Sequence, residues 1–301
     1  MIDFFNKNCF SNVYGIGRTI VALATLITLV FTSSYDLFDY NLFEYNRSHT
    51  FLDSINIFYL LGYENLILTK WISILVLLLV VTGFYPRITG ILHFIVVYSF
   101  HKTCSITDGG DQIAMILVFL LIPVTLLDSR VNHFFEKKTN TSFFSNSISV
   151  LILKIIIPLQ MAVVYLHAAM HKLYSVPEWR DGTALYYILL DPLFANDIFR
   201  NPFVMDIVSS PYIVNSMTWG SILIEIVLFG SFFMSYPKRK YTLILGFFFH
   251  FLIIIYFGLA SFFFSMFGGL VILSLNPYTQ VKFSEWKSYF KNRQLIVTKS
   301  V

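Results

Sequence analysis

Two histidines and a lysine stand together at the end of one apolar stretch. His167 and His171 are four residues apart, so on a helix they share a face and could bind a metal or pass protons near neutral pH. Two histidines are too few ligands for a metal site, and we predict no metal. Lys172 follows directly. It could act as a base if it is held away from water, or it could extend to the polar surface, as lysines at helix ends commonly do.

A second group of polar residues could supply a partner for the lysine. Residues 108–112 read Asp-Gly-Gly-Asp-Gln, just before another apolar run. Asp111 could cap the helix that follows, and Asp108 could pair with Lys172 or Arg180. The segment has too few oxygen ligands for a calcium site.

Three ionisable residues interrupt apolar runs: His93, Glu225 and His250. Charged and titratable groups are costly in lipid, so each is a candidate functional residue. A polar contact between helices would explain them equally well. We expect Glu225 to face His250 or His93 inside a helix bundle.

The residues after Lys172 predict a surface-lying segment. Trp179 is typical of an anchor at a membrane interface, and Asp181-Gly182 predicts a turn. Residues 184–190 are expected to form an interfacial helix.

The elements that position these residues are membrane helices. Of the 301 residues, 56% are hydrophobic and 13% are charged, against roughly 25% charged in soluble domains. We predict an all-α, polytopic helical bundle with about eight transmembrane helices, because a span needs roughly 20 apolar residues. Residues 34–65 and 173–215 are expected to hold short helices. The expected spans are 14–33, 66–84, 86–102, 112–129, 148–172, 216–236, 240–257 and 260–276.

Charge distribution predicts the orientation of these spans. With both termini in the cytoplasm, 15 of the 21 lysines and arginines fall on the cytoplasmic side. The acidic residues gather on the other side, which therefore carries Lys172. Cys9 and Cys104 fall on opposite sides, so no disulfide within the chain is expected. The basic residues are spread over short loops and form no patch for nucleic acid.

Three motifs carry a resemblance to known families, from about residue 10 to about residue 280. The first reads Tyr165-x-x-Ala168-x-x-x-Lys172-Leu173, followed by Glu178-Trp179-x-x-Gly182. It resembles the membrane domain of vitamin K-dependent gamma-glutamyl carboxylase, also called the horizontally transferred transmembrane (HTTM) domain. Residues 108–112 look like a second landmark of that domain. Residues 12–18 (Asn-Val-Tyr-Gly-Ile-Gly-Arg) resemble the start of the sporulation-delaying protein B family.

The resemblance implies a domain division and a function. It implies an HTTM-like domain at 1–280 and a basic cytoplasmic tail at 281–301. It also implies the membrane component of a bacterial system that matures a peptide toxin. Such a protein would lie in the bacterial plasma membrane and act with a small companion protein on a secreted toxin precursor at the outer face.

The resemblance also implies roles for particular residues. Lys172 falls on the carboxylase lysine that deprotonates vitamin K hydroquinone, and Asp108 or Asp111 would orient it. The essential carboxylase histidine has no counterpart in residues 108–112, and we expect no large lumenal domain. The predicted catalytic residues are Lys172, His171, His167, Asp108 and Asp111. The predicted substrate-binding residues are Tyr165, Trp179, Asp181, Glu225 and His250.

Other functions stay open at this point. The chain could be a quinone-linked carboxylase or oxidoreductase, with a lipid quinone as cofactor. It could equally be a non-enzymatic membrane scaffold or an immunity factor. A transporter is less favoured, because the sequence shows no internal repeat. Whether the chain is an enzyme is therefore not decided by its sequence.

Overall fold

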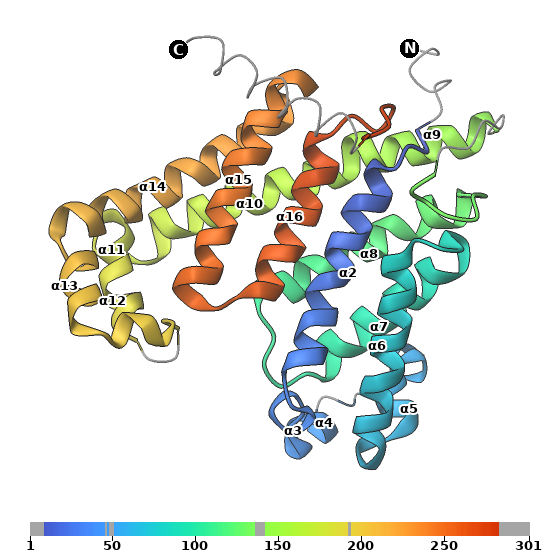
Figure 1. Cartoon of the computed structure of the whole chain (residues 1–301), viewed down its shortest axis with the longest axis horizontal. Coiled ribbons are helices and arrows are strands. Elements are labelled where there is room, and N and C mark those ends of the chain that lie inside the picture. Colours follow the sequence, from blue (N-terminus) through green and yellow to red (C-terminus); the bar gives the residue numbers. More distant parts are fainter. Residues whose placement is uncertain (1–8, 46, 48–50, 136–141, 192–193, 283–301) are drawn as a thin grey trace, which may run out of the picture.

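The chain folds as a bundle of helices (Figure 1). The computed structural model describes residues 9–45, 47, 51–135, 142–191 and 194–282. These ranges contain no strand, and a single isolated bridge joins Phe84 to Asn132. The predicted all-α class is therefore confirmed.

The long helices follow the apolar runs of the sequence. Two of them, α9 (Phe143–Leu151) and α10 (Ile157–Ser175), form one continuous helical segment through a π-helical turn at Ile152–Ile156. Pro158 lies just after this turn. The turn has a local cause, because proline has no N–H to donate to the carbonyl of Lys154. The long helices are α2 (Val13–Phe31), α6 (Leu66–Thr82), α7 (Pro86–Thr103), α8 (Gly109–Leu127), α9 (Phe143–Leu151), α10 (Ile157–Ser175), α14 (Pro211–Gly230), α15 (Tyr236–Phe257) and α16 (Ala260–Ser274).

Six helical segments in the described ranges are long and apolar enough to cross a membrane, which indicates a multi-pass membrane protein. They are Val13–Phe31, Tyr63–Thr82, Gly109–Leu127, Phe143–Ser175, Pro211–Phe233 and Tyr236–Phe257. The other two expected spans are also helical. However, α7 carries His101 and Lys102 in its last turn, and α16 has only 15 residues. At 1.5 Å per residue α16 is shorter than the roughly 30 Å hydrocarbon core, so the count of eight stays a prediction.

Short helices fill the two segments where we expected them. The second segment includes α12, whose bounds are those predicted for the interfacial helix. The short helices are α3 (Ser34–Leu37), α4 (Tyr40–Tyr45), η1 (Phe51–Ile55), α5 (Ile57–Leu61), η2 (Tyr63–Asn65), α11 (Pro177–Arg180), α12 (Ala184–Leu190), η4 (Asp197–Arg200), α13 (Pro202–Val208) and, after α14, η5 (Ser231–Phe233).

The centre of the bundle is the packing of α2 against α16, which lie side by side in Figure 1. Gly17 and Gly268 allow this approach. A Cβ on Gly17 would lie 2.5 Å from a side-chain carbon of Ile272, and one on Gly268 would lie 2.9 Å from the Gly17 carbonyl oxygen. Small residues let helix backbones come close in membranes, where dispersion contacts replace the hydrophobic effect between helices.

The turns between helices divide into two groups, and hydrogen bonds join members within each group. In one group, the Tyr85 amide donates to the Val131 carbonyl, and Arg239 Nη1 donates to the Leu273 carbonyl. In the other group, the Ser105 amide donates to the Leu37 carbonyl, and the Asn196 amide donates to the Tyr256 carbonyl. The Ser261 hydroxyl donates to the Asp108 carboxylate. The predicted order of spans puts the members of each group on one side of the membrane, and that order and its orientation stay predictions.

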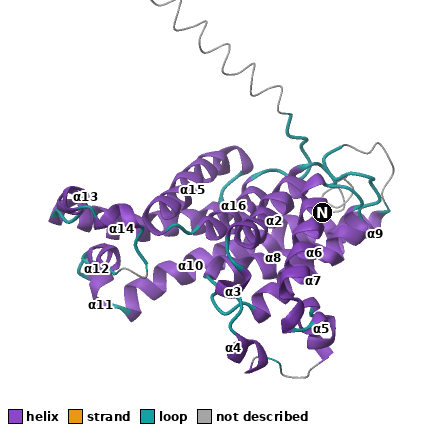
Figure 2. Ribbon diagram, turned by 60° about the horizontal axis from the view of Figure 1, so that its bottom comes forward, coloured by secondary structure: helices purple, strands orange, loops and turns teal. Residues whose placement is uncertain are grey.

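The helices α11, α12 and α13 form one end of the molecule. Figures 1 and 2 both place them at the end remote from α5 and α9. They pack on α14, and the Leu185 amide of α12 donates to the Thr218 hydroxyl at 3.3 Å. This end of the molecule also contains Lys172.

A buried polar cluster joins the beginning of the described chain to its end. Asp128 accepts from the Tyr14 hydroxyl and from Arg130, whose Nη2 lies 2.7 Å from Oδ2. Arg130 Nη1 also donates to the carbonyls of Ser11 and Phe135. We call Asn12, Tyr14, Asp128, Arg130 and Gln280 the terminal polar cluster.

Asn12 completes this cluster. Its side chain donates to the Val281 carbonyl at 2.9 Å and accepts from the Val281 amide at 2.8 Å. Gln280 donates to the Phe134 carbonyl and accepts from the Asn12 amide. The first and last described segments therefore lie on one side of the bundle. The expected tail at 281–301 falls outside the described residues except for its first two positions.

Candidate functional site

Lys172 lies in the last turn of α10 and forms an ion pair with Glu225 of α14. Lys172 Nζ lies 2.6 Å from Glu225 Oε1, and the two side chains are 19% and 8% exposed. We expected Asp108 or Asp111 to orient the lysine, and Glu225 to face a histidine. Both expectations are wrong about the partner, because among the described residues the carboxylate on Lys172 is that of Glu225.

Trp179 also contacts Lys172. The chain leaves α10 at Ser175, takes an extended conformation at Val176 and starts α11 at Pro177. This bend places the Trp179 ring 4.7 Å from Lys172 Nζ, within range of a cation–π contact. A residue predicted as an interfacial anchor therefore also forms part of the site.

Tyr165 and His250 form a second buried pair next to the first. The Tyr165 hydroxyl lies 2.9 Å from His250 Nε2, and both side chains are almost fully buried. Tyr165 is seven residues before Lys172, so the two share one face of α10.

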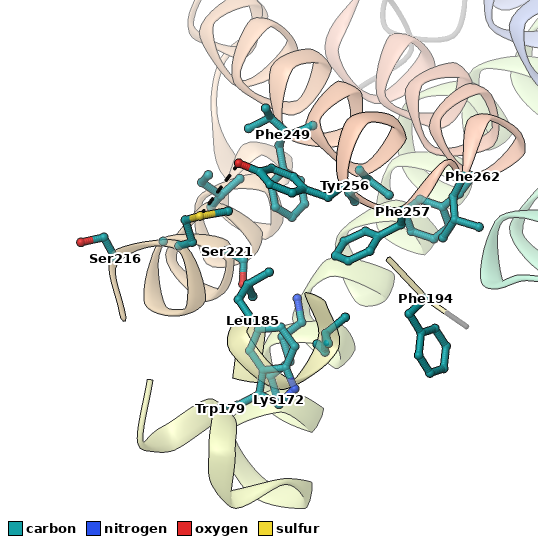
Figure 3. Close-up of a pocket in the computed structure, with 17 residues that line it drawn as sticks. Lys172, Trp179, Leu185, Phe194, Ser216, Ser221, Phe249, Tyr256, Phe257 and Phe262 are labelled. Carbon is teal, nitrogen blue, oxygen red and sulfur yellow. Dashed lines mark hydrogen bonds between the residues drawn. The ribbon is translucent and has the colours of Figure 1, made fainter. Parts of the chain in front are cut away.

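A cavity of about 510 Å³ opens beside Lys172 (Figure 3). Figure 3 shows Lys172 and Trp179 next to Leu185, with Phe249 and Tyr256 further along the wall. Among the described residues that line it, Lys172 is the only charged one. The lining residues are Lys172, Trp179, Leu185, Ile188, Phe194, Ser216, Met217, Gly220, Ser221, Ile224, Phe249, Leu252, Ile253, Tyr256, Phe257, Leu259 and Phe262.

The two histidines that we predicted as catalytic residues, His167 and His171, are not among the residues that line this cavity. His167 and His171 are exposed, and their rings stack with centroids 6.2 Å apart. No group of three or more His, Cys, Asp or Glu side chains that could hold a metal ion occurs in the part of the chain that the structure describes.

Among the described residues, none of the predicted aspartates forms an ion pair with Lys172, and Asp108 and Asp111 have local partners. Asp108 is the N-cap of α8, where its side chain accepts from the Asp111 amide at 2.9 Å. Asp111 is the third helical residue and accepts from the Asp108 amide in return, so the cap is Asp108 and not Asp111 as predicted. Asp108 also accepts from the Ser261 hydroxyl at 2.8 Å. Asp181 is exposed in the turn after α11.

Sequence reasoning missed most of the cavity wall. On α14 the lining positions include Ser216, Gly220 and Ile224, and on α15 they include Phe249 and Tyr256. These spacings place each set along one helical face, a pattern that is visible in the sequence. The same pattern arises wherever a helix packs on a neighbour, so it does not distinguish a cavity wall from a packed interface.

Comparison with known proteins identifies two relatives over almost the whole chain. The uncharacterised protein YitO of Bacillus subtilis (strain 168) is 34% identical over 304 residues, which cover 97% of this chain and 96% of the relative. Sporulation-delaying protein SdpB of the same organism is 33% identical over 290 residues, which cover 95% of this chain and 87% of the relative. No protein-family model and no solved structure matches the chain.

Proposed function

Because the chain belongs to the family of sporulation-delaying protein SdpB, we propose that it is the membrane component of a bacterial system that matures a peptide toxin. The observation that carries this proposal is the 33% identity over 95% of the chain. In this proposal the protein lies in the plasma membrane. It acts with a small companion protein on a secreted toxin precursor, at the outer face.

Lys172 is the central residue of the proposed site. It supplies the one charged group among the described residues of the cavity wall, and Glu225 holds its position. Trp179, Tyr165 and His250 complete the site around this pair. The exposed His167 and His171 could contact the companion protein or carry protons at the surface, while Asp108, Asp111 and Asp181 would shape the same face of the protein.

Replacing Lys172 with alanine tests the proposal. We expect cells that express the chain with its precursor and companion to lose at least about tenfold of their toxin activity, because the variant removes the charged group of the site. The measurement is killing of a sensitive lawn, with protein abundance checked by immunoblot. Lys102→Ala is the matched control, since Lys102 also lies in the last turn of a long helix but not at the cavity.

Full toxin activity in Lys172→Ala, at normal abundance, would favour the scaffold or immunity function over a site that handles the precursor. The apolar cavity beside Lys172 is also the kind of site that a quinone-linked enzyme needs. For that alternative, the observation to seek is a quinone that remains bound when the protein is extracted in detergent.

The outward orientation is tested by cysteine labelling. Burial raises the pKa of the Cys9 thiol to about 12 and that of the Cys104 thiol to about 11. Both thiols then stay protonated near pH 7.5 and should react slowly with a maleimide, since the thiolate is the nucleophile. Thr107 and Ser235 are exposed, and the proposed topology puts them on opposite sides of the membrane, so each is a position for a reporter cysteine.

We expect a membrane-impermeant maleimide to label Thr107→Cys in intact cells and Ser235→Cys only after permeabilisation. The unsubstituted chain is the control and should stay nearly unlabelled until the pH approaches the raised pKa values of its thiols. Labelling of Ser235→Cys alone in intact cells would place the cavity on the cytoplasmic side and contradict action at the outer face.

A further inference from the structure

The cavity beside Lys172 has the volume of a ligand-binding site, and the net charge at its wall is small. Its volume of about 510 Å³ lies within the range of roughly 300–1,000 Å³ typical of ligand pockets. The ammonium of Lys172 is already paired with Glu225, so the two charges largely cancel. A phosphate or carboxylate would gain little attraction from such a pair while losing its hydration. The wall therefore favours an uncharged ligand over a phospholipid headgroup or a fatty acid.

Several polar groups on the wall have unused hydrogen-bonding capacity. Lys172 has three N–H groups, and Glu225 accepts from one. Among the described residues, the Tyr256 hydroxyl has a single long contact, with Met217 Sδ at 3.9 Å, and a thioether is a weak acceptor. Ser221 donates to the Thr218 carbonyl, and its hydroxyl oxygen accepts no hydrogen bond from the part of the chain that the structure describes. These groups come from α10, α15 and α14, so they are distributed around an apolar cavity.

A peptide backbone fits this distribution better than a ligand with one polar head. It repeats carbonyl and N–H groups along an apolar body, and each group left unpaired in an apolar site is costly. We propose that the cavity binds an uncharged, apolar segment of a peptide, with Lys172 donating to one of its backbone carbonyls. This inference rests on the proposed function, in which the substrate is a toxin precursor.

Two glycines of α14 supply a matched pair of variants. Gly220 lines the cavity and Gly230 does not, and a Cβ added at either would meet no atom within 4 Å. Leucine in place of a helical glycine also raises helix propensity. Gly220→Leu therefore adds a side chain to the cavity wall at a position with room for its Cβ, and Gly230→Leu adds the same side chain elsewhere on the same helix.

Photocrosslinking measures occupancy directly. The full chain is purified in lipid nanodiscs with benzoylphenylalanine at Phe249, which lines the cavity, or at Phe248, which is 58% exposed and does not. The probe is a capped synthetic peptide of about 20 leucine and alanine residues. We expect a peptide adduct at position 249 and none above background at position 248. Gly220→Leu should reduce the adduct by about tenfold or more, while Gly230→Leu should preserve it.

The mass of the adduct decides the class of ligand. A phospholipid or quinone mass at position 249, or no adduct there, overturns the proposal, as does equal loss in the two leucine variants. This measurement does not depend on toxin activity. A peptide adduct together with full toxin activity in Lys172→Ala would retain the binding site and reject the proposed role of Lys172. Loss of toxin activity in Lys172→Ala without a peptide adduct at position 249 would retain the proposed role of Lys172 and reject the peptide-binding site.

Discussion

Replacing Glu225 alone with leucine destabilises the protein, and replacing Lys172 with methionine in the same chain restores its stability. The first change leaves the ammonium of Lys172 without its carboxylate, in surroundings where an unpaired charge is costly. We expect a loss of about 3 kcal/mol, which corresponds to a decrease in Tm of roughly 6–12 °C. The double variant removes both charges and keeps apolar side chains of similar length.

We expect the double variant to recover its stability because the Lys172–Glu225 ion pair makes few other hydrogen bonds. Glu225 Oε1 accepts from Lys172, and Glu225 Oε2 is buried without a hydrogen-bond partner among the described residues. Removing both side chains therefore leaves no other described group without its hydrogen-bond partner, and buried ion pairs can often be replaced by apolar residues without loss of stability.

Thermal unfolding in detergent measures stability, and the lawn assay measures function on the same variants. We expect the double variant to be stable but inactive, which would show that the ion pair is kept for function. A double variant as unstable as Glu225→Leu would contradict this, and would show that the pair holds α10 and α14 together. Ile226→Ala, an exposed neighbour on α14, controls for mutation of this helix as such.

The helices were predictable from the sequence, and the partners of the site residues were not. Apolar runs of about 20 residues specify helices because a backbone in lipid must satisfy its own hydrogen bonds. Capping of the helix after residue 108 was also predictable, because a capping box spans only four positions, although we assigned the cap to Asp111 and the structure assigns it to Asp108. The pairing of Lys172 with Glu225 spans 53 positions and depends on which helices become neighbours.

Histidine positions illustrate the same limit. His167 and His171 have helical spacing that suggests chemistry, yet both are exposed, whereas His250 became a partner of Tyr165 across two helices. His93 is fully buried with no hydrogen bond from either ring nitrogen to the described residues. Local spacing identifies which residues share a face, but the direction in which that face points is set by packing between helices.

Replacing Asp128 with leucine in the terminal polar cluster has an equally large effect on stability. Asp128 is 1% exposed and accepts from the Tyr14 hydroxyl and from the Arg130 side chain and amide. Its loss leaves the guanidinium of Arg130, whose side chain is 3% exposed, without the carboxylate that it pairs with. We expect a cost of about 3–5 kcal/mol, measured as a lower Tm and lower abundance in the membrane. Arg87→Ala, an exposed arginine on the same side, should change neither.

The double variant Asp128→Leu with Arg130→Met should not recover, in contrast to the pair at the cavity. Arg130 also donates to the carbonyls of Ser11 and Phe135, and Asp128 is the acceptor for Tyr14. Removing both charges leaves three buried groups without these partners: the Ser11 carbonyl, the Tyr14 hydroxyl and the amide of residue 130, at roughly 1–3 kcal/mol each. Recovery of Tm in this double variant would contradict the structural role of the cluster. Recovery at the cavity pair without recovery here would distinguish an ion pair kept for function from one that holds the fold.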